Sequence, residues 1–393
     1  MALSRRSFVQ AFGLGTVAAA AYGPSRVLAA RGREALAELP PWERDRALAL
    51  SANGTAIRLN SNENPIGPGP AAIDAIRSAL SEANRYPFAS ETDVTAAIAR
   101  ARGVPVDHVL IGCGSTEVLK MAVTACVSPT RALVTASPTF EDPGYNARAL
   151  GAPVIEVPVD RDLRLDLDAM RDRATNAGLI FFCNPNNPTA TVHGAPAVSA
   201  FVSAVNRISP KTTILIDEAY HEYVDDPAYQ TAIPLALENP RVIVSRTFSK
   251  VFGMAGLRIG YAIGRPEALE PLKKHQLDVA VNVLAAAAAM GSLADADHIA
   301  AERSRNREVR QFTRDAIAKL GYPVPVSNTN FVMFDVRRKV KDVIDGCRKE
   351  GVLIGRAFPP LDTHARISIG RMDEMRTCVD VLGRVLGRTT SHG

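Results

Sequence analysis

Short apolar runs, each about as long as one buried strand, recur along this chain with helical patterns between them. They occupy residues 108–111, 132–135, 154–157, 179–183, 213–216, 241–244 and 261–263. A continuous apolar run predicts a strand buried on both faces, and the intervening helices provide the crossovers that parallel strands need. We therefore expect an α/β fold with a mostly parallel sheet sandwiched by helices.

The chain has 393 residues, which is enough for two or three domains. Beyond the recurrent runs come an alanine-rich helical stretch at 281–293, a charged helix at about 300–320, and a strand, helix, strand, strand, helix pattern. We predict a large domain over 76–280 and a smaller α/β domain formed by both chain ends. The N-terminal part of this small domain is 31–75, and its C-terminal part is 281–393.

Composition excludes several classes of protein. Hydrophobic residues make up 47% and charged residues 22%, as in ordinary globular proteins, so disorder and a coiled rod are disfavoured. The five cysteines are scattered, odd in number and without a CxxC pair. That pattern favours neither a disulfide framework nor a zinc site, and we predict mostly reduced, buried thiols and no metal.

The small excess of basic over acidic residues does not indicate a nucleic-acid partner. The formal charge is +5, and three of the positive charges are arginines in the first 29 residues, which contain no acid; the remainder carries +2. No block of lysines and arginines with interleaved aromatic residues occurs. We therefore expect no nucleic acid to bind.

The first 29 residues have the pattern of an export signal. Arg5 and Arg6 precede an apolar stretch at 11–22, and small residues follow at 27–30, as at a cleavage site. The stretch is shorter than the roughly 20 residues that span a bilayer. It predicts a twin-arginine signal peptide over 1–29, export by that machinery to the periplasm, and no membrane span in the mature form. The alternative is an ordinary amphipathic N-terminal helix.

Polar side chains follow four of the predicted strands, where ligands bind in open α/β sheets. These segments are 112–117 (GCGSTE), 184–189 (NPNNPT), 217–220 (DEAY) and 247–250 (TFSK). A lysine at position 250 can form an imine. Each segment also has a structural explanation, since Asp217 can cap a helix, the Asn-Pro run can form a turn, and Lys250 can be solvated.

The glycines before Ser115 and Thr116 permit a tight turn into a helix whose free N–H groups can bind a phosphate. A dinucleotide-binding fold uses the same device. Here the third glycine of the GxGxxG pattern is missing, so a nicotinamide-dependent dehydrogenase is weakly supported.

The joint order of the motifs is more specific than any one of them. The chain resembles the fold-type I pyridoxal phosphate enzymes, and most closely the histidinol-phosphate aminotransferase branch of the class I and II aminotransferases. The resemblance covers nearly everything after the export signal. The matching segments are 62–68 (NENPIGP), 85–87 (RYP), 114–117 (GSTE), 137–140 (SPTF), 184–189, 217–220, 247–250, 256–260 (GLRIG) and 366–370 (RISIG).

The resemblance implies pyridoxal 5'-phosphate as cofactor and assigns roles around its ring. Lys250 matches the lysine that forms the Schiff base and moves the proton at the substrate Cα. Asp217 matches the carboxylate that keeps the ring nitrogen protonated. Asn187 and Tyr220 match the pair that hydrogen-bonds the ring hydroxyl, and Phe140 lies where the family stacks an aromatic side chain on the ring.

The resemblance also assigns residues to the cofactor phosphate. They are Ser115 and Thr116 at a helix start, the hydroxyls of Thr247 and Ser249, and Arg258. Tyr86 resembles the tyrosine that reaches the phosphate from the neighbouring subunit. A homodimer with shared active sites is therefore implied.

The substrate residues follow from the same resemblance. Arg366 matches the arginine that holds a substrate carboxylate, and Asn187 is assigned to substrate binding as well as to the cofactor. Arg356 falls near the position associated with a distal anionic group, although a solvated arginine is an alternative. Ile66 stands where several histidinol-phosphate enzymes carry a tyrosine, and Ala190 replaces a frequent glycine. Export also removes the enzyme from cytoplasmic histidine synthesis, which argues against histidinol phosphate as the physiological substrate.

The sequence thus predicts an aminotransferase that exchanges an amino group between an amino acid, or an amine like histidinol phosphate, and a 2-oxo acid. Two alternatives use the same fold. One is another reaction of the same cofactor, such as decarboxylation, racemisation or oxidation by oxygen. The other is an exported binding protein without catalysis, which the joint presence of Lys250, Asp217 and Arg258 disfavours. His193 and His221 flank these motifs, and we expect structural roles for them.

Overall fold

The computed structural model describes residues 56–387. The predicted signal peptide lies outside the described residues. A seven-stranded sheet has the order β2-β8-β7-β6-β5-β3-β4. Its strands are β2 (Val109–Gly112), β3 (Ala132–Ser137), β4 (Val154–Pro158), β5 (Ala177–Cys183), β6 (Thr213–Asp217), β7 (Val242–Thr247) and β8 (Gly260–Ile263).

The sheet is mostly parallel, as the sequence predicts. β3, β4, β5, β6 and β7 pair in parallel, whereas β8 is antiparallel to both of its neighbours, β7 and β2. The segment 248–259 joins β7 to β8 without the helix that a parallel crossover normally contains. This irregular connection carries Lys250 and Arg258, so the exception to parallel pairing lies at the predicted site.

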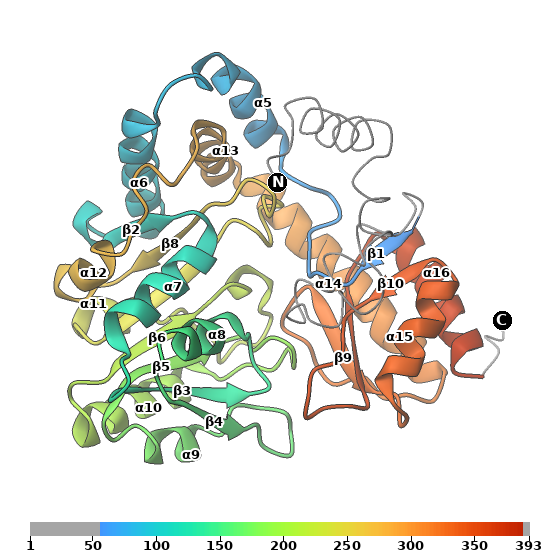
Figure 1. Ribbon diagram of the computed structural model, residues 1–393. Helices are drawn as coiled ribbons and strands as arrows, with labels where there is room; N and C mark the ends of the chain where they lie inside the picture. The colour runs from blue at the N-terminus through green and yellow to red at the C-terminus, as the bar shows by residue number, and fades with distance from the viewer. Residues whose placement is uncertain (1–55, 388–393) are drawn as a thin grey trace, which may run out of the picture.

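Helices cover both faces of the sheet (Figure 1). They are α5 (Pro70–Ala79), α6 (Phe88–Arg102), α7 (Gly114–Cys126), α8 (Asp142–Ala149), α9 (Leu167–Asp172), α10 (Ala195–Ile208), α11 (Ile233–Glu238), α12 (Pro266–Lys273) and α13 (Val283–Ala294), with 3-10 turns at Leu80–Glu82, Val106–His108 and His221–Tyr223. Successive strand residues pack into different cores: Ile180 and Phe182 into one, Leu179 and Phe181 into the other. This alternation is what a strand buried on both faces requires.

A second body follows α14 (Ala296–Lys319), and it has the predicted strand, helix, strand, strand, helix order. Its elements are β9 (Phe331–Asp335), α15 (Val340–Lys349), β10 (Val352–Ile354), β11 (His364–Ser368) and α16 (Met372–Val385). β9 and β11 pair antiparallel, and their side chains share a core with α15 and α16. This body lies on the right in Figure 1.

Both chain ends contribute to the second body. β1 (Ile57–Leu59) pairs in parallel with β10, with Ile57 opposite Val352. The alanine-rich helix α13 instead packs on α5 and α6, and its buried alanines belong to the core of the large sheet. The precise domain boundaries at 75/76 and 280/281 stay predictions. Among residues 56–387, no helix combines the length and the apolar character that crossing a membrane requires.

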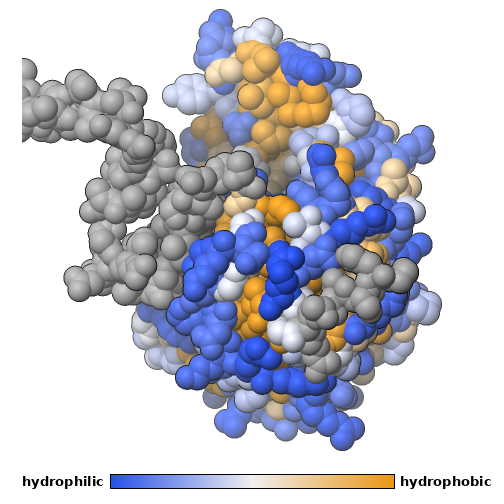
Figure 2. All heavy atoms as spheres, turned by 90° about the vertical axis from the view of Figure 1, so that its right-hand side faces the viewer, coloured by the Kyte–Doolittle hydropathy of each residue, from blue (hydrophilic) through white to orange (hydrophobic). Residues whose placement is uncertain are grey.

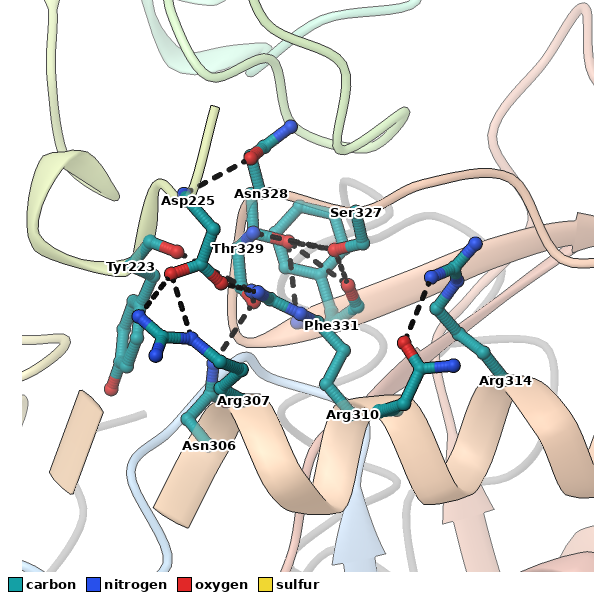
Figure 3. A network of polar contacts seen from close by, with 11 residues as sticks. Tyr223, Asp225, Asn306, Arg307, Arg310, Arg314, Ser327, Asn328, Thr329 and Phe331 are labelled. Atoms are coloured by element: carbon teal, nitrogen blue, oxygen red, sulfur yellow. Dashed lines mark hydrogen bonds and ion pairs between the residues drawn. The ribbon is translucent and has the colours of Figure 1, made fainter. Parts of the chain in front are cut away.

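A polar network joins α14 to the loop before β9 and to the segment after Tyr223 (Figure 3). Arg310 of α14 donates to the backbone oxygen of Thr329 at 2.6 Å and also pairs with Asp225. The Asp225 backbone N–H in turn donates to the Asn328 side chain at 3.2 Å. These contacts hold the 327–330 loop, whose Asn330 reaches the candidate site described next.

Candidate active site

A cavity of about 510 Å³ opens at the carboxyl ends of the central strands, between the two bodies. All the predicted site residues except Tyr86 line it. They are Ser115, Thr116, Phe140, Asn187, Asp217, Tyr220, Thr247, Ser249, Lys250, Arg258, Arg356 and Arg366. The fold therefore brings together groups that are up to 251 positions apart in the sequence, as far as Ser115 is from Arg366.

Asp217 ends β6 and is 4% exposed. Its Oδ1 has no hydrogen-bond partner among the residues that the structure describes. Burial raises the pKa of Asp217 to about 7, while the Ser245 hydroxyl and the Lys250 charge oppose that shift. A buried carboxylate oxygen without a partner suits a cationic N–H group in the cavity. Asp217 caps no helix, which removes the structural explanation.

Lys250 lies in the turn after β7, and its Nζ donates to the backbone oxygen of Asn62 at 3.1 Å. Burial lowers the pKa of Lys250 to about 8, and the positive charge of Arg366 acts in the same direction. A lysine with a lowered pKa has a larger neutral fraction near pH 7, which a nucleophile or base needs. The alternative of a solvated Lys250 is therefore not supported.

Asn62 connects the amine to the rest of the site. Its side-chain amide donates to the Tyr220 hydroxyl at 3.1 Å, and its carbonyl oxygen also accepts from Asn330 at 3.0 Å. Its backbone φ is 54°, in the left-handed region that asparagine tolerates better than most residues. Burial raises the pKa of the Tyr220 phenol. The phenol therefore stays protonated at neutral pH and can donate a hydrogen bond.

The predicted phosphate residues form a cradle around the N-terminus of α7. Arg258 donates to the Ala255 oxygen at 3.0 Å and to Thr116 Oγ1 at 3.5 Å. Thr247 Oγ1 donates to Ser249 Oγ at 2.9 Å, which places both hydroxyls together. N-terminal helix amides, hydroxyls and an arginine are the donors that a phosphate requires.

Two glycines make this cradle possible. Gly114 has φ +74°, and a Cβ there would lie 2.3 Å from Arg258 Nη2. A Cβ at Gly260 would lie 2.3 Å from the Ser115 backbone nitrogen. Side chains at either position would occupy the space of the cradle itself. The cavity thus offers both a buried carboxylate and a phosphate cradle, which fits pyridoxal phosphate.

Arg366 of β11 is 7% exposed and projects into the cavity from the second body. Its Nη1 donates to Asn187 Oδ1 at 2.7 Å, and its Nη2 donates to the Asn60 oxygen at 2.8 Å. Its guanidinium also lies 4.6 Å from the centre of the Phe358 ring. The side chain is therefore held in one orientation, as bidentate recognition of a carboxylate requires.

Arg356 is held by a partner that the sequence did not indicate. It forms an ion pair with Glu141, which follows Phe140 at the start of α8. Its Nη1 donates to the Ala357 oxygen at 2.8 Å, and its guanidinium lies 4.3 Å from the Phe358 ring centre. Arg356 thus lines the cavity, as predicted, but as a paired rather than a solvated charge.

Tyr86 lies outside the cavity of its own chain and is 75% exposed. It contacts Phe88, with ring centroids 5.9 Å apart, and Ile66 and Leu80 are also exposed in this N-terminal part of the fold. Figure 2 shows apolar side chains gathered at the top of the molecule, the end at which α5 lies in Figure 1.

The two histidines near the motifs serve the structure rather than the cavity. His193 Nε2 lies 3.0 Å from the Leu165 oxygen, and burial lowers its pKa to about 4. His221 Nδ1 lies 3.1 Å from the Tyr229 hydroxyl. Neither residue lines the cavity. Of the five cysteines, Cys113 is partly exposed and the others are buried, and all are free thiols.

Sequence reasoning assigned no role to three residues that shape this site: Asn62, Glu141 and Asn330. Asn62 acts on Lys250 through its backbone oxygen, which a side-chain motif does not report. Glu141 is recognisable only through its pairing with Arg356, 215 positions away. The only sequence signal for Asn62 was its place in the NENPIGP segment, which matched a family motif although no role was assigned to its residues.

Comparisons with known proteins agree with this geometry. Residues 55–382 match the family model for aminotransferase class I and II. The chain is 36% identical over 333 residues to the histidinol-phosphate aminotransferase of Symbiobacterium thermophilum, covering 84% of this chain and 91% of that protein. It is 37% identical over 335 residues to the aromatic amino acid aminotransferase of Nocardia farcinica, covering 83% and 90% respectively.

A solved structure extends the likeness to three dimensions. Histidinol-phosphate aminotransferase from Sinorhizobium meliloti, in complex with pyridoxal-5'-phosphate, superposes with a TM-score of 0.82 at 28% identity. The match covers 89% of this chain and 98% of that one. With the family model spanning nearly all of the described fold and the cavity suited to the cofactor, the chain belongs to the class I and II aminotransferase family and is a pyridoxal phosphate-dependent aminotransferase.

Proposed function

We propose that this aminotransferase acts on free amino acids, whose carboxylate binds Arg366, and passes the amino group to a 2-oxo acid. The observation that carries the proposal is the fixed guanidinium of Arg366 in the same cavity as Lys250. A bidentate arginine selects a planar carboxylate. Holding that carboxylate fixes the orientation of the substrate Cα, which favours cleavage of its C–H bond over loss of the carboxylate.

The chain's own groups account for the steps of this reaction. Pyridoxal phosphate, when bound, supplies an electron sink for the charge that develops at the substrate Cα. Lys250 would hold the cofactor aldehyde and, once released, accept and return the Cα proton as a general base. Asp217 would keep the ring nitrogen protonated, and Tyr220 and Asn187 would donate hydrogen bonds to the ring oxygen. Ser115, Thr116, Thr247, Ser249 and Arg258 would bind the phosphate.

We propose further that the active unit is a homodimer in which Tyr86 completes the neighbouring chain's site. The exposed aromatic pair Tyr86 and Phe88, together with the exposed Ile66 and Leu80, supports this proposal. Large apolar side chains that are exposed together mark interaction surfaces. We also propose that the enzyme is exported to the periplasm by the twin-arginine machinery, on the evidence of residues 1–29 alone.

A panel of amino donors and 2-oxo acids, with identification of both products, tests the reaction. The purified holoenzyme should convert an amino acid to its 2-oxo acid while aminating the acceptor, and Lys250→Ala should do neither. Carbon dioxide release, racemised amino acid, or hydrogen peroxide formed without an acceptor would instead identify another reaction of the same cofactor. A yellow protein that transfers no amino group to any acceptor would contradict catalysis altogether.

A further inference from the structure

The distal part of the cavity carries an unusual charge arrangement around Arg356. Arg356 and Arg366 both lie against the Phe358 ring, at 4.3 Å and 4.6 Å from its centre. The carboxylate-binding arginine and Arg356 therefore contact the same aromatic ring. Phe358, Phe140 and Arg356 line the same cavity as Arg366, so they are available to the side chain of a substrate whose carboxylate binds Arg366.

Arg356 is already engaged in this arrangement. One of its terminal nitrogens pairs with Glu141 and the other donates to the Ala357 oxygen. The pair is partly shielded from solvent, with side chains 18% and 33% exposed. A carboxylate or phosphate on the substrate side chain would have to displace Glu141 from Arg356. It would then leave one negative charge unpaired in a partly buried site, which is unfavourable.

A second acid strengthens this effect. Asp142 follows Glu141 and lines the same cavity. Burial, together with the charge of Glu141, raises the pKa of Asp142 to about 6, so that it is largely ionised above neutral pH. Asp142 therefore adds a second negative charge to the lining of this cavity, where the charges of Arg258 and, less strongly, Arg356 act on it. An uncharged side chain meets no such repulsion and can pack against Phe140 and Phe358.

We propose that Glu141 is a specificity-determining residue that directs this enzyme toward amino acids with uncharged, especially aromatic, side chains and against those with a distal anionic group. The proposal rests on the function proposed above, because it needs the substrate carboxylate on Arg366. A substrate with an anionic distal group must then break the Glu141–Arg356 ion pair in order to bind, whereas one with an uncharged side chain leaves that pair intact.

L-glutamine and L-glutamate form a matched pair of donors, because they have nearly the same shape and differ in distal charge. In single-turnover half-reactions of the holoenzyme at pH 7.5, the loss of cofactor absorbance gives kcat/KM for each donor, and L-phenylalanine is the aromatic probe. We expect the wild type to favour glutamine and phenylalanine over glutamate by about 10-fold or more, as the loss of a partly buried ion pair implies.

Glu141→Gln keeps the shape of the side chain and removes its charge. We expect it to raise the glutamate to glutamine ratio of kcat/KM by about 10-fold or more, and Glu141→Ala to change that ratio in the same direction. Glu156→Gln is the matched control, because Glu156 also pairs with an arginine, Arg148, but does not line the cofactor cavity. The control should keep the wild-type ratio.

Two results would overturn the proposal: a wild-type enzyme that prefers glutamate to glutamine, or Glu141 variants whose ratio equals that of the wild type. Both results leave transamination itself intact. If none of the three amino acids reacts with the wild-type holoenzyme, the specificity proposal fails, and the panel of donors and 2-oxo acids described above decides whether the proposed function fails as well.

Discussion

Arg366 Nη1 donates a 2.7 Å hydrogen bond to Asn187 Oδ1, which joins the substrate-binding arginine to a residue of the cofactor site. Because the amide oxygen of Asn187 accepts from Arg366, its N–H₂ group remains as the donor for the ring oxygen of the cofactor. This hydrogen bond also connects the two bodies of the fold, because Arg366 lies on β11 of the second body and Asn187 follows β5 of the large sheet. The Asn187 side chain thereby links the position of Arg366, which orients the substrate, to the hydrogen bond on the ring oxygen of the cofactor.

This coupling predicts different results for two substitutions of Asn187. Asn187→Ala should raise the KM for the amino donor and weaken cofactor binding, each by about 10-fold or more, because it removes a hydrogen bond to a charged group. Asn187→Asp keeps the acceptor for Arg366, so it should affect cofactor binding and leave the donor KM much closer to wild type. Cofactor titration and steady-state kinetics measure the two effects, and an alanine variant with unchanged donor KM would contradict the coupling.

Asp217 should lower the stability of the cofactor-free protein. Its pKa is raised from 3.8 to about 7 in the folded chain, so the folded state binds more protons than the unfolded state between these pH values. Its contribution to stability is therefore lost as pH rises through that window, by up to about 4 kcal/mol. Cofactor-free Asp217→Asn should be more stable than wild type at pH 8, and the difference should shrink as pH falls toward 4.

The same Asp217→Asn substitution should lower kcat/KM of the holoenzyme by about 100-fold or more, since a buried charge partner is lost. Chemical unfolding at several pH values, paired with activity assays, checks both parts. A variant that is less stable than wild type at pH 8 without cofactor would contradict the assigned environment of the carboxylate.

Gly114→Ala should weaken cofactor binding while leaving most of the fold intact. The added methyl group would meet Arg258 Nη2 at 2.3 Å and push the guanidinium out of the cradle. We expect a cofactor Kd raised by about 10-fold or more, because a charge-assisted contact to phosphate is lost. Gly103→Ala is the matched control: its φ is also positive, +64°, but a Cβ there meets nothing within 4 Å.

The control should lose about 1 kcal/mol of stability, as a left-handed alanine implies, and should bind the cofactor normally. Equilibrium dialysis and thermal unfolding separate the two effects. An equal change in Kd for both glycine variants would indicate general backbone strain rather than a blocked cradle.

Shared active sites predict complementation between two inactive chains. Lys250→Ala lacks the reactive amine, and Tyr86→Ala lacks the side chain proposed to reach the neighbouring phosphate. In a hybrid dimer of the two, one site combines an intact Lys250 with an intact Tyr86. Co-expressed and differently tagged chains, purified as the hybrid, should therefore regain up to about half of the wild-type activity per dimer, in line with the closed symmetry of such dimers. Hybrids with only the summed activity of the two parents would contradict the shared site.

Export predicts that the full-length chain with a C-terminal tag accumulates in the periplasmic fraction of a Gram-negative host that has the twin-arginine machinery. Arg5→Lys combined with Arg6→Lys should retain it in the cytoplasm, because the arginine pair is the recognised feature. Arg26→Lys is the control for a charge-conserving change within the same segment. Unchanged fractionation of the double variant would remove the support for export by this route.

The sequence alone determined the order of strands and helices, the largely parallel sheet and the identity of most groups around the cavity. These features are local: buried strands show as short apolar runs, and the chemistry of the fold lies in the few residues after each strand. Lys250, Asp217 and Arg258 are recognisable because each belongs to a contiguous motif: Asp217 ends β6, Lys250 follows β7 and Arg258 precedes β8.

Only the tertiary structure decided how these groups act on one another. The backbone oxygen of Asn62 accepts a hydrogen bond from Lys250, and the side-chain oxygen of Asn187 accepts one from Arg366. Glu141 forms an ion pair with Arg356. Each contact joins segments that are far apart in the chain, and burial shifts the pKa values of Asp217, Asp142 and Lys250. Distance and desolvation arise only when the two bodies pack together, so no pattern along the chain reports them.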